Sequence, residues 1–438
     1  MNITKEIFRL AIPNIISNVT VPLMGLVSTA IAGRIGDSAL SIGSLAIGVS
    51  IFNFLYWNTS FIRMGTSGLT AQAFGRGDFH ETTLLFLRSM LVCVIVGVVV
   101  LLLQYPFGKI AVRVMNGNEI VSSYFFTRIW AVPAGIALYG IYGWLIGMQN
   151  AVLPMTISIF VNLVHVLFSF LFAFGMDMGI RGIALASVVA QWSGLLLSLV
   201  LIFLFYHRKF KRVTLSEVVD SKSIRLFFRI NTDIIIRTFC LCLVYTFFTA
   251  ASARMEDKNA LAMNTMLLQL FTLFSYMNDG FAYASEALVG RFVGARDLST
   301  LRLCIKHCFV WSFATAFIAI LLYVVYGNEL MQLFVSEGEQ SNALVLQAMD
   351  YIWWIVAIPL ISAIPFLLDG IMTGATLTKI MRDSMLLSTT LFFVIFYLFK
   401  DELGNNAIWL GFASYMVIRG VCQLWMSHGL KSVFDKAR

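Results

Sequence analysis

The sequence places two carboxylates inside an apolar segment, where a charged side chain is energetically unfavourable. Asp279 and Glu286 lie seven positions apart in the stretch NDGFAYASEALVGRFVG, residues 278–294. At about 100° per residue they share one face of a helix, about 10 Å apart along its axis. An acid near the bilayer centre costs at least about 2.5 kcal/mol, so it usually has a partner, a water-filled cavity or a bound ion. The pair is therefore either an ion site or one side of a salt bridge that locks helices together.

The second half of the chain contains four acids and two arginines within apolar segments: Asp233, Arg237, Asp279, Glu286, Asp369 and Arg419. Asp233 and Arg237 are four residues apart and can pair directly on one helix. Four acids against two arginines leave at least one carboxylate without a fixed cation, so it would be protonated or bind a cation. This count places ion coupling at Asp279, Glu286 and Asp369. The alternative is that some of these residues lie at helix ends in water.

The first half of the chain offers amides, hydroxyls and one histidine in its apolar segments. Asn162, His165 and Ser169 follow one another at spacings of three and four, which puts them on one helix face. They form the candidate wall of a substrate cavity, and Ser28, Asn53 and Gln149 are added to it. His165, with an unperturbed pKa of about 6.5, is a second candidate for ion coupling. The same polar residues could instead bond helices to one another.

These residues belong to a membrane protein. Of 438 residues, 59% are hydrophobic and 12% are charged, against about 25% charged in soluble domains. Twelve apolar segments are long enough to span a bilayer, near 8–32, 40–62, 84–104, 121–146, 152–174, 180–206, 230–252, 260–285, 303–325, 347–371, 379–399 and 405–428. The net charge of +8 comes from lysines and arginines gathered in loops on one side, which indicates membrane orientation rather than nucleic-acid binding. Both termini are therefore expected in the cytoplasm.

A weak internal repeat divides the chain into two halves. SGLTAQAFGRGD at 67–78 corresponds to EALVGRFVGARD at 286–297, and Gly143 and Gly147 correspond to Gly370 and Gly374. Six segments separate the copies, so the halves are parallel repeats. We therefore expect a lobe over 1–206, a cytoplasmic linker over 207–229 and a second lobe over 230–438. Such halves usually enclose a cavity that opens alternately to the two sides, which is the organisation of a transporter.

The sequence carries no motif that is typical of an enzyme or of a cofactor site. Cys304, His307 and Cys308 share a helix face, but no fourth ligand accompanies them, so no metal site is predicted. No Gly-rich loop followed by Lys and Ser/Thr occurs, and neither does a nucleophile elbow or a Ser/Lys dyad in register. We therefore expect no cofactor and no enzymatic activity.

Several stretches along the chain resemble the multidrug and toxic compound extrusion (MATE) family, in its DinF-like branch. The resemblance covers nearly the whole chain and rests on these stretches: IFNFLYW (51–57), RMGTSGLTAQAFGRGD (63–78), GMDMGIRGIALASVVAQ (175–191), NTDIIIRT (231–238), DGFAYASEALVGRFVGARD (279–297) and LDGIMTGATLTKIMRDSMLLS (368–388). It implies twelve helices in two pseudo-symmetric six-helix lobes. It also implies an inner-membrane exporter of organic, often cationic or amphipathic, compounds, driven by inward flow of H⁺ or Na⁺. A monomer is expected.

The sequence also departs from this family in the first lobe. Members of the branch typically carry an Asp in the first helix, where this chain has Ser28. They also carry an Asn and an Asp in the fifth helix, where His165 and Ser169 stand. A serine does not titrate in the useful range, so the coupling group is either His165 or the acids of the second lobe. We favour the acids. The alternative function is a lipid-linked oligosaccharide flippase, whose chamber is typically strongly cationic.

Overall fold

The computed structural model describes residues 2–36, 38–255, 259–334 and 339–437. This part of the chain contains no strands, and twelve of its helical stretches are long and apolar enough to cross a membrane. The predicted all-α membrane protein with twelve spans is therefore confirmed. The second span is longer than predicted, because Leu40–Gly75 runs on through two helices.

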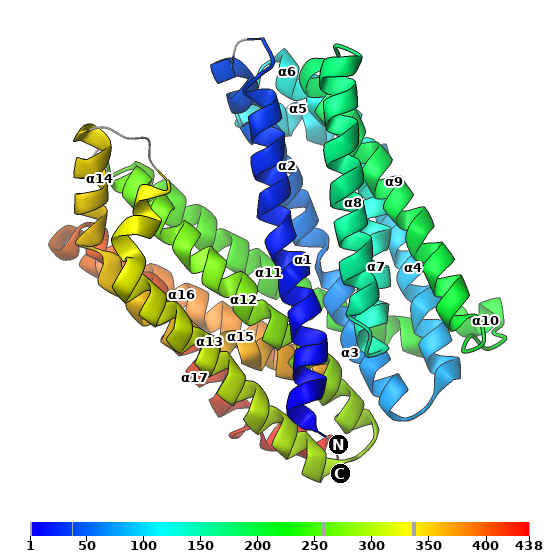
Figure 1. Cartoon of the computed structure of the whole chain (residues 1–438). Coiled ribbons are helices and arrows are strands. Elements are labelled where there is room, and N and C mark those ends of the chain that lie inside the picture. The colour runs from blue at the N-terminus through cyan, green and yellow to red at the C-terminus, as the bar shows by residue number, and fades with distance from the viewer. Residues whose placement is uncertain (1, 37, 256–258, 335–338, 438) are drawn as a thin grey trace. The chain divides into compact units, whose positions relative to one another are not determined.

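The helices of the first half are α1 (Ile3–Ala32), α2 (Ser38–Thr59), α3 (Phe61–Gly75), α4 (Phe79–Leu102), α5 (Gln104–Val114), α6 (Glu119–Arg128), the 3-10 turn η1 (Ile129–Ala131), α7 (Val132–Gly147), α8 (Val152–Phe170), the π-helical turn η2 (Leu171–Gly175) and α9 (Gly179–Tyr206). The remainder are α10 (Leu215–Val218), α11 (Ser221–Ala253), α12 (Ala260–Gly294), α13 (Leu298–Gln332), α14 (Glu339–Met349), α15 (Ile352–Gly374), α16 (Thr378–Leu403), α17 (Asn405–Met426) and α18 (Lys431–Asp435). Figure 1 shows them in chain order by colour.

The chain forms two compact units. Unit 1 consists of Met1–Ile15 and Thr232–Arg438, and unit 2 of Ile16–Asn231. The units differ from the predicted lobes because residues 1–15 pack with the second half and residues 207–229 pack with the first. The chain passes between units inside α1 and inside α11, at corresponding places of the two repeats.

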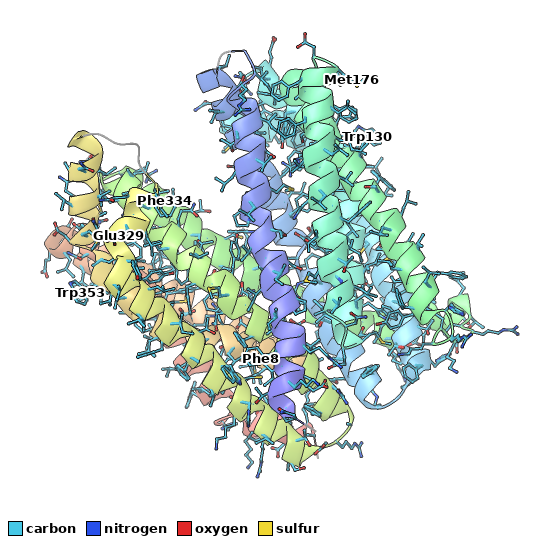
Figure 2. The ribbon with its side chains drawn as sticks, viewed as in Figure 1. Phe8, Trp130, Met176, Glu329, Phe334 and Trp353 are labelled. Carbon is cyan, nitrogen blue, oxygen red and sulfur yellow. The ribbon has the colours of Figure 1, made fainter. Side chains whose placement is uncertain are left out.

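Aromatic and hydrogen-bond contacts hold the start of α1 in unit 1. Phe8, labelled in Figure 2, packs edge-on against Trp311 of α13 with ring centroids 4.6 Å apart. It also contacts Phe281 of α12 at 5.9 Å. The Thr4 hydroxyl lies 3.0 Å from His307 Nδ1. These contacts explain why a segment from the first half of the sequence belongs to unit 1.

The predicted linker is an ordered part of unit 2 because a buried arginine holds it. Arg88 of α4 donates from Nε to the Val218 carbonyl at 3.2 Å and from Nη2 to the Glu217 carbonyl at 2.8 Å. Its Nη1 pairs with Glu81 at 2.9 Å. Charge-assisted bonds to two main-chain carbonyls fix α10 against α4, so residues 207–229 are not a free tether.

Glycines bring the equivalent helix pairs of both units into close contact. In unit 1, a Cβ on Gly370 of α15 would lie 2.2 Å from the Ala282 carbonyl oxygen of α12. In unit 2, a Cβ on Gly143 of α7 would lie 2.4 Å from the Arg63 carbonyl oxygen of α3. Glycines thus let these helix backbones approach closely, and the same packing recurs in both repeats.

Large apolar side chains cover much of the outer surface of each unit. Trp130 and Met176 of unit 2 and Phe334 and Trp353 of unit 1, labelled in Figure 2, are all exposed. In water such a surface would aggregate, whereas in a bilayer it is the surface that lipid covers. The exterior therefore agrees with the twelve membrane spans.

Replacing Gly370 or Gly143 by alanine tests the glycine contacts. Each new methyl group meets a main-chain oxygen that a rotamer change cannot move, so we expect a loss of about 1–3 kcal/mol of stability. Gly25→Ala is the matched control, since nothing lies within 4 Å of its Cβ position. Thermal unfolding of the purified protein measures all three. An unchanged midpoint for Gly370→Ala would contradict the close packing.

Candidate functional site

His165 of α8 lies at the centre of a cluster of serine hydroxyls in unit 2. Its Nε2 is 3.1 Å from Ser28 Oγ of α1 and 3.4 Å from Ser169 Oγ of α8, and its Nδ1 is 3.4 Å from Ser187 Oγ of α9. All four side chains are buried. The predicted grouping of Ser28, His165 and Ser169 is present, and Ser187 completes it. Both ring nitrogens therefore have hydroxyl partners. A hydroxyl can accept a hydrogen bond from a protonated ring nitrogen or donate one to an unprotonated ring nitrogen.

The other residues predicted for the cavity are not part of this cluster. Asn162 lies one turn before His165 on α8, and its buried Nδ2 has no hydrogen-bond partner in the described residues. Asn53 is an exposed residue of α2. Gln149 follows the end of α7 with a φ of 65° and donates to the Gly147 carbonyl at 3.2 Å, which is a helix-terminating arrangement. Whether these residues contact substrate stays a prediction.

One charged residue near this cluster was not considered in the sequence analysis. Arg128, at the end of α6, lies near enough to act electrostatically on the His165 ring. Its guanidinium carbon lies 4.7 Å from the Phe52 ring centroid and 5.5 Å from that of Tyr124, whose hydroxyl accepts a hydrogen bond from Nη1. A cation within 6 Å of aromatic faces is stabilised without a carboxylate. A count of charges in the fourth apolar segment would have found Arg128.

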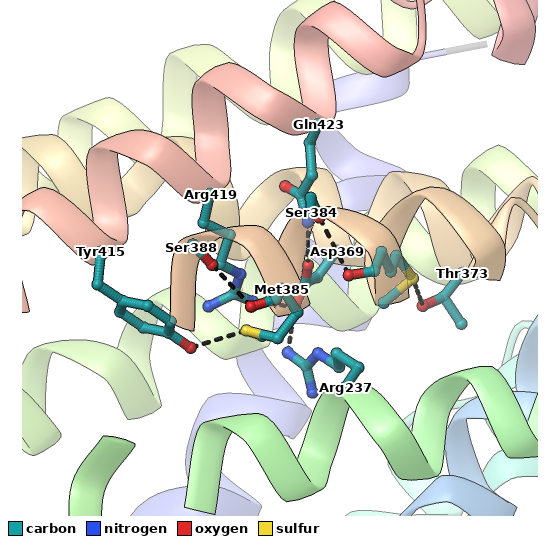
Figure 3. A network of polar contacts seen from close by, with 10 residues as sticks. Arg237, Asp369, Thr373, Ser384, Met385, Ser388, Tyr415, Arg419 and Gln423 are labelled. Carbon is teal, nitrogen blue, oxygen red and sulfur yellow. Dashed lines mark hydrogen bonds and ion pairs between the residues drawn. The ribbon is translucent and has the colours of Figure 1, made fainter. Parts of the chain in front are cut away.

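In unit 1, Asp369 of α15 lies between two arginines (Figure 3). Its Oδ2 pairs with Arg237 of α11 and with Arg419 of α17. Its Oδ1 accepts a hydrogen bond of 2.6 Å from Gln423 Nε2. Asp369 and Arg419 are buried. The carboxylate therefore has its cationic partners inside the unit rather than in solvent. The expectation that Asp369 lacks a fixed cation is wrong, because α11 and α17 bring two guanidiniums and one amide donor to it.

The predicted pairing of Asp233 with Arg237 is also wrong. Asp233 Oδ1 accepts from Arg382 Nη1 at 2.7 Å, and its Oδ2 accepts from the Thr378 hydroxyl at 2.9 Å. Both partners belong to α16, whereas Arg237 turns to Asp369. Tertiary contacts thus replaced the neighbour four residues along the helix. With Arg382 included, four acids face three arginines, so the predicted surplus of acids falls from two to one.

The two acids of α12 remain candidates. Glu286 is buried, and Asp279 is half-buried and acts electrostatically on Tyr245 and Tyr276. Neither residue belongs to the ion-pair network in which Asp369 binds Arg237 and Arg419. The role of Asp279 and Glu286 in ion coupling stays a prediction.

Metal chemistry finds no support in the described part of the chain, where no group of three or more His, Cys, Asp or Glu residues is placed to hold an ion. Cys304 and Cys308 are buried free thiols, and His307 contacts Thr4 as described above.

Comparison with known proteins decides the family. The MatE family model matches residues 13–171 and 234–398, one stretch in each half of the chain. The chain belongs to the MATE family. DNA damage-inducible protein F of Escherichia coli K12 is 32% identical over 437 residues, covering 97% of this chain and 92% of that protein. A probable multidrug resistance protein NorM of Synechocystis is 24% identical, covering 96% of this chain and 93% of its own length.

Solved MATE structures have the same fold. The outward-facing conformation of a multidrug resistance MATE family transporter matches with a TM-score of 0.85 at 18% identity, covering 99% of this chain and 97% of that one. A MATE crystal structure in the straight conformation gives 0.88 at 17% identity, with the same coverage. The twelve-span MATE architecture is therefore confirmed, and this chain is a multi-pass membrane transporter rather than an enzyme.

Asp369→Asn tests the charge centre of unit 1. The substitution leaves Arg237 and the buried Arg419 without a counter-charge, and an uncompensated buried charge costs about 3–5 kcal/mol. We expect a correspondingly large fall in the thermal midpoint. Asp383→Asn is the control, because Asp383 pairs with the partly exposed Arg382 and surface pairs contribute about 1 kcal/mol or less. Equal stability of the two variants would contradict the assignment.

Proposed function

We propose that this transporter exports small organic compounds across the inner membrane in exchange for protons, with His165 as the residue that carries the proton. The single observation behind this proposal is the cluster in which His165 contacts hydroxyls of α1, α8 and α9. Export itself rests on the family, since relatives such as NorM are named as multidrug resistance proteins.

The chemistry of imidazole suits this role. Histidine is the side chain whose ordinary pKa lies near physiological pH. In the neutral ring one nitrogen donates and the other accepts, whereas both donate when the ring is protonated. The serine hydroxyls around His165 rotate to satisfy either state. Proton uptake therefore reverses the hydrogen bond at the one nitrogen that accepts in the neutral ring, which faces either Ser28 of α1 or Ser187 of α9. A group with different contacts in two conformations shifts the equilibrium between them.

The contacts of Asp369 support His165 over the acids of unit 1, which reverses the preference stated from the sequence. A carboxylate that two guanidiniums already neutralise offers little to a sodium ion or a proton. The same contacts argue against the flippase alternative, since Arg237 and Arg419 are engaged with Asp369 rather than available to a pyrophosphate. Asp279 and Glu286 remain in the proposal as further proton carriers.

The centre around His165 also bears on the coupling ion and the substrate. Sodium prefers several oxygen ligands with negative charge, whereas this cluster has a nitrogen ring at its centre and a guanidinium nearby, so we propose H⁺ rather than Na⁺. Protonation would place a second positive charge beside Arg128. A cationic or amphipathic substrate would then be repelled, which makes binding of proton and substrate mutually exclusive, as exchange requires. We further propose a monomer with both termini in the cytoplasm, on the strength of the loop charges.

Transport by purified protein in liposomes tests the role of His165. With an imposed pH gradient, His165→Gln should lower export of a cationic dye about tenfold or more, because glutamine keeps hydrogen bonds but takes up no proton. His165→Asp restores a titratable group and should recover pH-driven export with its midpoint moved to lower pH. A sodium gradient alone should drive no export.

Dye binding at equilibrium is the control for His165→Gln and should change little. His207→Gln, the same substitution on an exposed histidine that follows α9, is the matched control outside the cluster and should transport normally. Full pH-driven export by His165→Gln, together with loss in Asp279→Asn or Glu286→Gln, would move the proton site to α12 and overturn the assignment.

A further inference from the structure

A cluster of positive charge follows the end of α9 in unit 2. Arg208, Lys209, Lys211 and Arg212 are all exposed and occupy four of five consecutive positions. None of the four forms an ion pair with an acid in the described residues, whose salt bridges lie elsewhere. The acids that follow are engaged locally, since Glu217 accepts from the Thr214 main-chain N–H at 2.6 Å and Asp220 from that of Ser223 at 2.9 Å. The cluster therefore presents its charge to the surroundings.

The main chain beneath the cluster is held in place on both sides. The Lys211 N–H donates to Thr83 Oγ1 of α4 at 3.2 Å. Phe210 packs on Trp144 and Phe86, with ring centroids 5.5 and 5.4 Å away. Further along, Arg88 binds the carbonyls of α10, which lies beside α4 (Figure 1). An anchored loop holds the main chain that carries the cations, so less backbone freedom is lost when an anion binds.

The last turns of α9 carry an apolar stripe that leads directly to these cations. Leu196, Val200 and Leu204 follow one another at intervals of four, Leu199 and Phe203 lie beside them, and all are exposed. Residues three and four apart share a helix face, so the stripe is continuous along the helix. It ends where Arg208 begins the basic cluster. The apolar face of α9 is thus continuous with the positively charged loop that follows it.

We infer that this surface binds an anionic phospholipid, whose phosphate contacts the cations of 208–212 and whose acyl chains lie along α9. A nucleic acid would bind the cations but not the apolar stripe, and a small soluble anion would also leave the stripe uncovered. Each lysine or arginine near an anionic membrane surface contributes a favourable electrostatic free energy, and this contribution decreases as the salt concentration rises. The site lies apart from His165 and does not depend on the proposed transport mechanism.

Thermal unfolding in detergent tests this inference on the full chain. Adding phosphatidylglycerol should raise the unfolding midpoint of the parent protein by a few degrees, whereas phosphatidylcholine should not, because a ligand stabilises the state that binds it. The variant R208Q/K209Q/K211Q/R212Q should need about tenfold or more phosphatidylglycerol for the same shift. In 0.5 M salt the shift in the parent protein should shrink.

The control is K109Q/R113Q, which removes two other exposed basic residues, one of which also lies over a ring, as Lys209 does. It should keep the full response. If the fourfold variant unfolds without lipid, R208Q/K211Q replaces it, which leaves Lys209 on the Tyr206 and Phe79 rings. Equal shifts with both lipids, or an undiminished shift in the basic-cluster variants, would overturn the inference. So would an equal shift with glycerol 3-phosphate, which would indicate a soluble anion instead.

Discussion

The absence of water from the bilayer interior is the constraint on which this structure depends. A charge placed there has to find its partner within the protein, because desolvation costs several kcal/mol per ion. In unit 1 the answer is convergence, since Asp369 receives Arg237, Arg419 and Gln423 from two neighbouring helices. An ion-pair network of this kind does not need an external ion. It fixes the relative positions of α11, α15 and α17.

Uncharged polar groups in unit 1 obey the same rule. Asn264 of α12 donates to Ser252 and to Asn405, both at 2.7 Å, and accepts from Trp409 Nε1 at 2.8 Å. These contacts join α11, α12 and α17. A buried polar network with satisfied members favours one arrangement of helices over others, because a shifted register would leave donors without acceptors. Polar residues thus specify helix neighbours in a protein whose apolar side chains face both core and lipid.

Unit 2 meets the constraint in a different way, and that difference supports its proposed role. Arg128 is stabilised by aromatic rings and His165 by hydroxyls, so neither depends on a carboxylate. A titratable group without a fixed counter-ion is sensitive to proton supply, whereas a carboxylate held between two guanidiniums, such as Asp369, is much less so. The two units repeat the same helix packing, through Gly143 in one and Gly370 in the other. Their polar interiors have nevertheless become dissimilar.

The sequence by itself determined the class, the number of spans and the repeat with its corresponding glycines, because these depend on local composition and regular spacing. It also brought Ser28, His165 and Ser169 together through resemblance to family positions. Only the tertiary structure decided the partners of the charges. Asp233 binds Arg382 rather than Arg237, and Asp369 binds both Arg237 and Arg419, since helices distant in sequence supply contacts that a spacing rule does not contain. The assignment of residues 1–15 to unit 1 was likewise decided by side-chain packing between helices, which the order of segments along a chain does not specify.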